Sequence, residues 1–152
     1  LRTVDLSNND IEVRVWAGFG LTHLEGFTLK RLDGKWSALH IGYEFVSNNF
    51  KIRTSELAEP AGGWEAAWAS LLKHQILTLP DARSIKCEAM FEDGFSYVVE
   101  VKKGPAYRTY MYDNPAEDFD NRCKEADEIL AIASIIADDY RVPQIYPAGL
   151  RK

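Results

Sequence analysis

The sequence lacks long hydrophobic runs, has little cysteine and histidine, and contains no complete motif for a catalytic, nucleotide or metal site. No apolar run approaches the roughly 20 residues of a bilayer-spanning helix, so we expect no membrane span. Two cysteines are too few for a disulfide-dense scaffold. The three histidines, His23, His40 and His74, show no ligand spacing, so we predict no metal and no cofactor.

A surplus of basic residues is also missing. The chain has 18 Lys and Arg against 23 Asp and Glu, and its formal net charge is −5. Such a surface repels a phosphate backbone unless basic residues cluster, and here they gather only around two expected turns, at 30–35 and 102–103. We therefore expect no nucleic-acid partner.

The composition is that of an ordinary globular domain. Hydrophobic residues make up 46% of the 152 residues and charged residues 27%. This length is typical of one hydrophobic core, so we predict a single soluble, acidic domain spanning 1–152.

The first half of the chain predicts strands followed by a helix. Apolar residues alternate from Ile11 to Ala17, which indicates a half-buried strand. The stretch 26–41 indicates a hairpin, because Asp33 and Gly34 tolerate the positive φ angles of a tight turn. A further interrupted strand is expected at 42–52. After the breaker cluster 59–63, a helix is predicted by an apolar stripe of Trp64, Ala67, Trp68, Leu71 and Leu72, and Pro80 ends it.

The second half predicts a three-stranded meander and a second helix. The expected strands are Ile85–Phe91, Phe95–Lys102 and Tyr107–Tyr112. Asn114 and Pro115 suit a helix start, with Glu117 completing a capping box, so we expect a helix from there to about Tyr140. An extended tail follows at 141–152.

The expected fold class is therefore α+β, with antiparallel strands and two helices packed on one face. The two halves, 11–79 and 84–140, share an order of strands, a hairpin led by Gly-Phe and a helix. This order suggests two βββα units in tandem. Chance similarity between two generic hairpins is the alternative explanation.

The cysteines and the first residue bear on the compartment. Cys87 and Cys123 are compatible either with one bridge or with two free buried thiols. The chain starts at Leu1 without Met, which favours a secreted or periplasmic protein.

The richest candidate for a binding site is the strand Tyr107–Tyr112. Alternation places Arg108, Tyr110 and Tyr112 on one side of it. Tyr and Arg are enriched at interaction hot spots, so this side is expected to form an exposed aromatic binding face. The competing explanation is cross-strand aromatic pairing that only stabilises the sheet.

Three functional hypotheses remain. The leading one is a non-enzymatic protein-binding domain, comparable with small acidic bacterial inhibitors and immunity proteins. The second is a small-molecule or carbohydrate-binding domain, with Trp16 or Trp36 stacking on a ligand in a groove between the two halves. The third is an enzyme of unrecognised type, which needs a histidine or acid converging with a second polar group. We assign no catalytic residue.

Overall fold

The computed structural model describes residues 10–19, 24–46, 49–87, 94–116 and 123–146, with backbone alone at 44–46. Its elements, in chain order, are β1 (Ile11–Gly18), β2 (Glu25–Leu32), β3 (Lys35–Val46), β4 (Asn49–Leu57), α1 (Trp64–Lys73), η1 (Ala82–Ile85), β5 (Ser96–Lys103), β6 (Ala106–Asp113), α2 (Lys124–Asp138) and η2 (Pro143–Ile145).

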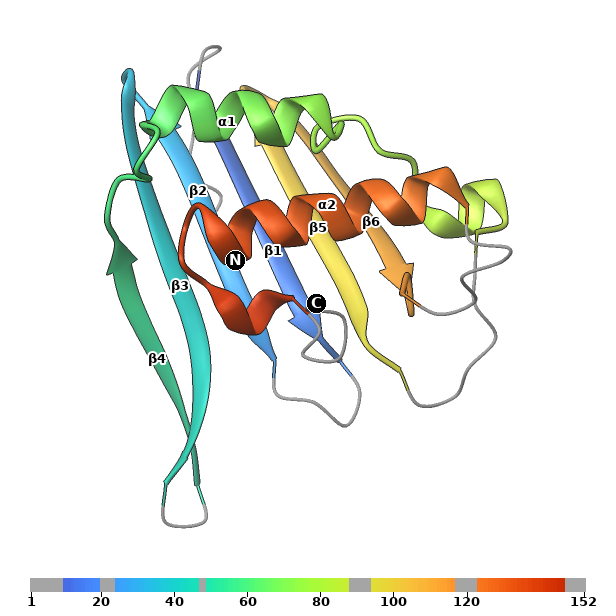
Figure 1. Ribbon diagram of the computed structural model, residues 1–152, viewed down its shortest axis with the longest axis horizontal. Helices are drawn as coiled ribbons and strands as arrows, with labels where there is room; N and C mark the ends of the chain where they lie inside the picture. The colour runs from blue at the N-terminus through green and yellow to red at the C-terminus, as the bar shows by residue number, and fades with distance from the viewer. Residues whose placement is uncertain (1–9, 20–23, 47–48, 88–93, 117–122, 147–152) are drawn as a thin grey trace.

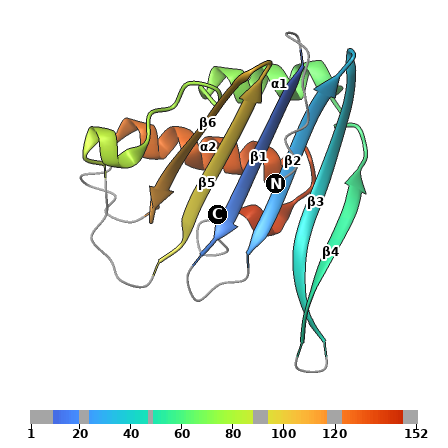
Figure 2. The same ribbon diagram turned by 180° about the vertical axis from the view of Figure 1, so that it is seen from behind.

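The strands form one antiparallel sheet in the order β4-β3-β2-β1-β5-β6. The predicted α+β class is confirmed. Figure 1 shows α1 and α2 in front of this sheet, and Figure 2 shows the sheet in front of both helices. We call the face toward α1 and α2 the helix side and the opposite face the open face. Within the described residues, no helix is long and apolar enough to cross a membrane.

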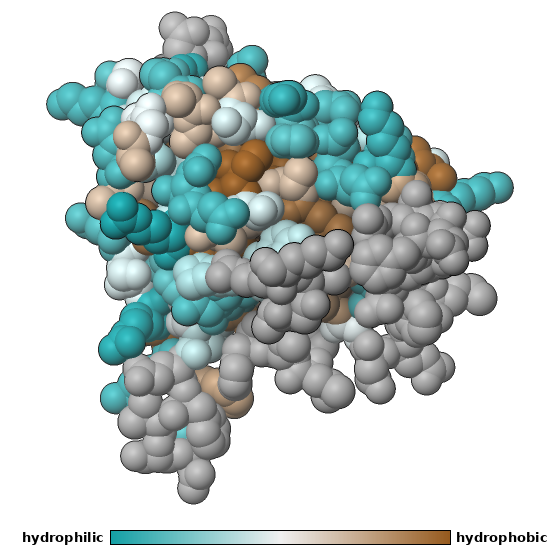
Figure 3. All heavy atoms as spheres, in the orientation of Figure 1, coloured by the Kyte–Doolittle hydropathy of each residue, from teal (hydrophilic) through white to brown (hydrophobic). Residues whose placement is uncertain are grey.

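The core lies between the sheet and the helices. The alternation predicted for β1 is observed: Ile11, Val13, Val15 and Ala17 are buried. Aromatic contacts join both helical regions to the helix side. Trp68 of α1 packs against Trp36 of β3 at 5.6 Å between ring centroids, and Tyr140 after α2 meets Phe27 of β2 at 4.8 Å. Figure 3 shows this side of the molecule, where hydrophilic residues surround a limited hydrophobic area.

Several local predictions are confirmed. The turn between β2 and β3 is formed by Asp33 and Gly34, with φ angles of 49° and 76°. The apolar stripe of the first predicted helix forms α1, in which Ala67, Trp68 and Leu71 are buried. The interrupted strand predicted at 42–52 is the end of β3 and the start of β4, and its turn at 47–48 lies outside the described residues.

Two element predictions in the second half are wrong. Ile85 ends the short helix η1 instead of opening a strand, because Asp81 accepts a hydrogen bond from the Arg83 N–H and caps that helix. The rest of that predicted strand, 88–91, is not described. Asn114 does not cap a helix either: its side chain accepts the Phe95 N–H at 2.7 Å, and α2 begins at Lys124. Glu117 lies outside the described residues.

The described elements do not reproduce the proposed repeat. Four strands precede α1, and two described strands lie between α1 and α2. A second three-stranded unit is therefore not seen in the described part of 84–140.

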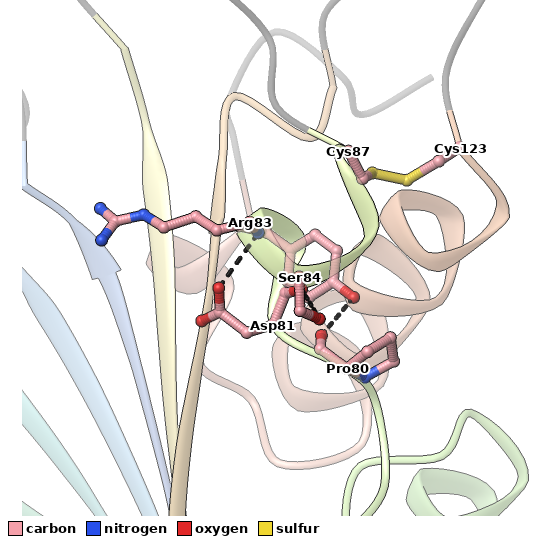
Figure 4. Close-up of a disulfide and its surroundings, with 7 residues drawn as sticks. Pro80, Asp81, Arg83, Ser84, Cys87 and Cys123 are labelled. Carbon is pink, nitrogen blue, oxygen red and sulfur yellow. Dashed lines mark hydrogen bonds between the residues drawn. A yellow bond between two sulfur atoms is a disulfide. The ribbon is translucent and has the colours of Figure 1, made fainter.

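A disulfide joins Cys87 and Cys123, which decides between the two alternatives left open above (Figure 4). Cys87 follows η1, and Cys123 is the N-cap residue of α2. Their Cα atoms lie 5.9 Å apart across 36 positions of sequence. The bridge thus ties the start of α2 to the segment that follows α1.

Removal of this bridge is expected to lower the free energy of unfolding. The loop-closure model gives about 4 kcal/mol for a loop of this length, with measured values of about 2–4 kcal/mol being typical. Urea unfolding of the Cys87→Ser/Cys123→Ser variant measures the loss. Reductant should bring the wild type to the level of this variant and leave the variant unchanged. Equal stability of the two proteins under oxidising conditions would contradict a stabilising role.

Candidate functional site

Arg108, Tyr110 and Tyr112, here called the β6 cluster, do not form an exposed binding face. Tyr110 and Tyr112 are 0% and 1% exposed, and Arg108 is half-buried. The register explains the error. Tyr110 lies opposite Val99, which lies opposite Val15, so this side of β6 faces the core. The expectation of an exposed aromatic face on these three residues is therefore wrong.

The β6 cluster instead holds the segment that follows α1. The Tyr110 hydroxyl donates to the Ile76 carbonyl at 2.7 Å, and the Tyr112 hydroxyl donates to the Pro80 carbonyl at 2.7 Å. The Arg108 guanidinium donates to the carbonyls of Leu77 and Leu79 and stacks on the Tyr110 ring at 5.0 Å. Carbonyls past a helix end lack intrahelical donors, so these three side chains satisfy groups that would otherwise be costly to bury.

The same segment also protects the β6 edge of the sheet. Asp81 accepts the backbone N–H of Met111 through Oδ2 at 3.0 Å, while its other carboxylate oxygen caps η1. Figure 4 shows Asp81 between η1 and the neighbouring strand. An outward N–H of β6 is thus paired within the chain.

Burial raises the pKa of four tyrosines above the ordinary value of 10. The pKa of Tyr112 rises to about 12 through desolvation, with the charges of Glu125 and Asp81 adding to the rise and that of Arg108 opposing it. Desolvation likewise raises the pKa of Tyr97, Tyr110 and Tyr140. Their neutral forms are therefore favoured by the folded state.

These shifts predict a loss of stability in alkali. A pKa raised on folding gives stability that is complete below about pH 10 and disappears as the pH rises through the folded pKa. Unfolding monitored by far-UV circular dichroism should therefore begin above about pH 10, and Tyr112→Phe should weaken this pH dependence. At neutral pH this variant is expected to lose about 1 kcal/mol with its hydrogen bond to Pro80.

Tyr107→Phe is the matched control, because Tyr107 is exposed on the same strand. Its alkaline unfolding curve should follow the wild type. An identical curve for Tyr112→Phe would contradict the burial argument.

The two predicted tryptophans lie on opposite sides of the sheet. Trp36 is on the helix side, where it packs against Trp68 and its indole N–H donates to Glu65 at 2.7 Å. Trp36 is therefore engaged in holding α1 and is not placed beside Trp16. Trp16 lies on the open face of β1 and is half-buried.

An apolar band crosses the open face at the level of Trp16. Cross-strand pairing aligns Met111 of β6 with Val98 of β5, Val98 with Trp16, Trp16 with Gly26, and Gly26 with Ile41 of β3. We call Met111, Val98, Trp16 and Ile41 the apolar band. All four are half-buried, so each keeps part of its side chain accessible.

Gly26 makes room for the Trp16 ring. A Cβ atom at this position would lie 2.5 and 2.7 Å from the indole atoms Cζ3 and Cε3, and 3.2 Å from the Cβ of Ile41. The six-membered ring therefore occupies the space above Gly26. It closes the gap that glycine would otherwise leave in the apolar band.

A network of ion pairs lies beside this band. It occupies the next two rows of cross-strand residues on the open face. Glu12 is buried and receives Arg14 Nε at 2.7 Å and Lys30 Nζ at 3.4 Å. Arg14 also donates to Glu100 on β5 at 3.2 Å. We call Glu12, Arg14, Lys30 and Glu100 the charged network. Its formal charges cancel, so the buried Glu12 carboxylate is compensated by two half-buried cations.

Two histidines contact carboxylates on the helix side of the molecule. His40 Nε2 lies 2.6 Å from Glu25, and His74 Nδ1 on the C-cap of α1 lies 2.7 Å from Glu128 on α2. A carboxylate can orient an imidazole for proton transfer. In the described part of the chain, however, neither ring has a hydrogen bond to a hydroxyl or thiol. His23 lies outside the described residues.

The described residues contain no group of three or more His, Cys, Asp or Glu side chains that could hold a metal ion. At the end of α2, the Asp138 carboxylate accepts the Ser134 hydroxyl at 3.2 Å.

Sequence reasoning missed most of the open face. Ile41, Val98 and Met111 are unremarkable in their own segments, and only the register of four strand pairs aligns them with Trp16. A local signal did exist for β4, where Lys51, Arg53 and Ser55 alternate with Phe50, Ile52 and Thr54. The sequence matches no family model and no curated protein.

Proposed function

We propose that this domain is a non-enzymatic protein-binding module that engages its partner through the open face of the sheet. The observation behind the proposal is the apolar band, which lies on the face turned away from α1 and α2. This replaces the face that the sequence suggested, because the β6 cluster belongs to the core. The comparison with small inhibitor and immunity proteins is by analogy.

The residues of the open face suit an interface in type and arrangement. Protein interfaces are enriched in Trp, Met and Arg, and they place apolar groups at the centre with polar groups at the rim. Here Trp16 and Met111 belong to the apolar band, and the charged network with Arg14 runs along one side of it. Because its charges are already paired, this network can border an interface without leaving an unpaired charge.

The proposal predicts which surface substitutions abolish partner binding. Ile41→Lys and Met111→Lys each place a charge in the apolar band and should reduce recovery of the partner by about tenfold or more, as expected for an interface centre. Quantitative affinity purification from the source cells measures this loss. Thermal unfolding of each variant shows whether the domain remains folded.

Leu72→Lys is the matched control. Leu72 is 42% exposed on α1, so the same kind of change is made on the helix side. The partner should be retained by this variant. Equal loss with all three variants, or loss with Leu72→Lys alone, would place the interface elsewhere.

A second candidate function is carbohydrate binding, which rests on the position of Trp16 over Gly26. An aromatic ring supported against a sheet is a platform on which an apolar ligand face can stack. Hydroxyl and carboxylate groups lie in the next row of cross-strand residues on this face, where the Ser96 hydroxyl donates to the Asp113 carboxylate at 2.6 Å. The ligand would lie on the open face.

This alternative predicts that soluble oligosaccharides change the tryptophan emission of the protein. Cellohexaose and maltohexaose are suitable probes. Trp16→Ala should abolish the response. Gly26→Ala should weaken it while retaining all four tryptophans, because the added Cβ displaces the Trp16 ring. A response that persists in Trp16→Ala but disappears in Trp36→Phe would exclude the platform.

A further inference from the structure

The strand β4 is the least protected part of the described fold. All of its residues except Leu57 are exposed, including Ile52 at 66% and Phe50 at 67%. It ends the strand order, so one of its edges pairs with β3 and the other is unpaired by any described strand. At the opposite end of the sheet, by contrast, Asp81 already occupies an N–H of β6.

Half of β4 belongs to an arm that extends past the rest of the sheet. Pairing of β2 with β3 stops at Gly26 and Ile41, whereas pairing of β3 with β4 continues to Val46 and Asn49. Figure 1 and Figure 2 show β3 and β4 projecting beyond the neighbouring strands. We call residues 42–46 and 49–53 the arm. A two-stranded ribbon is only marginally stable in water, so an additional strand would stabilise it.

The two sides of β4 differ in chemistry. Lys51 and Arg53 lie on the helix side, and Arg53 is directly opposite Gly42. Phe50 and Ile52 lie on the open face. A strand added to this edge would therefore meet cationic side chains on one side and apolar side chains on the other.

The charges argue against a second copy of this chain as the added strand. In an antiparallel pair, residues directly opposite each other lie on the same side of the sheet. A two-fold axis that crosses β4 at Lys51, at Arg53 or between them would place these residues of one copy opposite or diagonal to the same residues of the other. Like charges in these positions are destabilising, and charged edge residues are a known protection against self-pairing.

We infer that the free edge of β4 receives an extended strand from a different protein, in which acidic residues alternate with apolar ones. The backbone groups of the incoming strand would pair with those of β4, as in other cases of strand addition. Its acidic side chains would lie beside Lys51 and Arg53, and its apolar side chains beside Ile52 and Phe50. Phe50 and Ile52 lie on the same open face as the apolar band, but the β4 edge contains none of the four residues of that band, so the inference does not depend on the band.

Three synthetic peptides test the inference against the whole, oxidised protein. The first is an eight-residue peptide of alternating valine and aspartate, and the second replaces aspartate with lysine. The third is the valine–aspartate peptide with every second amide N-methylated, which keeps the side chains but blocks strand pairing. Binding is followed by chemical shifts and by hydrogen exchange of the backbone amides of Asn49–Leu57.

The expected result is binding of the valine–aspartate peptide, with slower exchange of outward amides of β4 and an affinity at least about tenfold above that of both other peptides. The Lys51→Glu/Arg53→Glu variant should prefer the lysine peptide. Met111→Lys is the control on the far strand, and it should bind the valine–aspartate peptide like the wild type. Normal binding by this control separates failure of the apolar band from failure of the β4 edge.

Other outcomes overturn the inference. These are an absence of binding up to about 1 mM peptide, equal binding of the N-methylated peptide, and an unchanged preference after charge reversal. Concentration-dependent dimerisation with protection of the β4 amides would instead identify a second copy as the occupant.

Discussion

The pairing of β1 with β2 on one side and β5 on the other is the constraint on which the rest of the structure depends. Successive side chains of a strand point to opposite faces, so this pairing determines the side on which every paired residue lies. Val15 is buried against the helices, and its cross-strand partners Phe27 and Val99 share that side. Trp16, one position further along, must then lie on the open face. The core and the apolar band are consequences of the same register.

The two edges of the sheet are protected in different ways, and this asymmetry follows from the path of the chain after each edge strand. After α1 the chain returns along β6, where the β6 cluster binds its carbonyls and Asp81 covers part of the edge. The disulfide then joins the end of this segment to the start of α2. After β4 the chain leaves directly for α1, and no described segment returns along that strand. Among the described residues of this strand, Lys51 and Arg53 carry charges on the helix side of that edge.

Local patterns in the sequence were sufficient to predict the elements whose stability is local. The alternation of β1, the Asp33-Gly34 turn and the stripe of α1 all depend on residues within a few positions of each other. Predictions failed where a distant group competed for the same atoms. Asn114 resembles a helix cap, but its side chain accepts the Phe95 N–H, 19 positions away. Ile85 resembles the start of a strand, but Asp81 caps that segment, which forms the short helix η1. The α+β class was nevertheless predicted correctly, because it depends on the whole set of strands and helices and not on any single element.

The candidate site was misplaced for a reason that reaches beyond this chain. Tyr and Arg are favoured at interfaces because they combine a large contact surface with a hydrogen-bonding tip, and the same properties suit a buried position beside unsatisfied carbonyls. Residue type therefore cannot separate the two roles. The two roles are separated by the position of the Ile76 and Pro80 carbonyls, which accept the tyrosine hydroxyls of β6. This position depends on contacts between residues far apart in the sequence. Trp16 shows the same dependence, because its ring lies over Gly26 on the open face, and Gly26 is its partner across the β1–β2 pair. The burial of the β6 tyrosines and the partial exposure of Trp16 therefore both depend on the strand register and not on residue type.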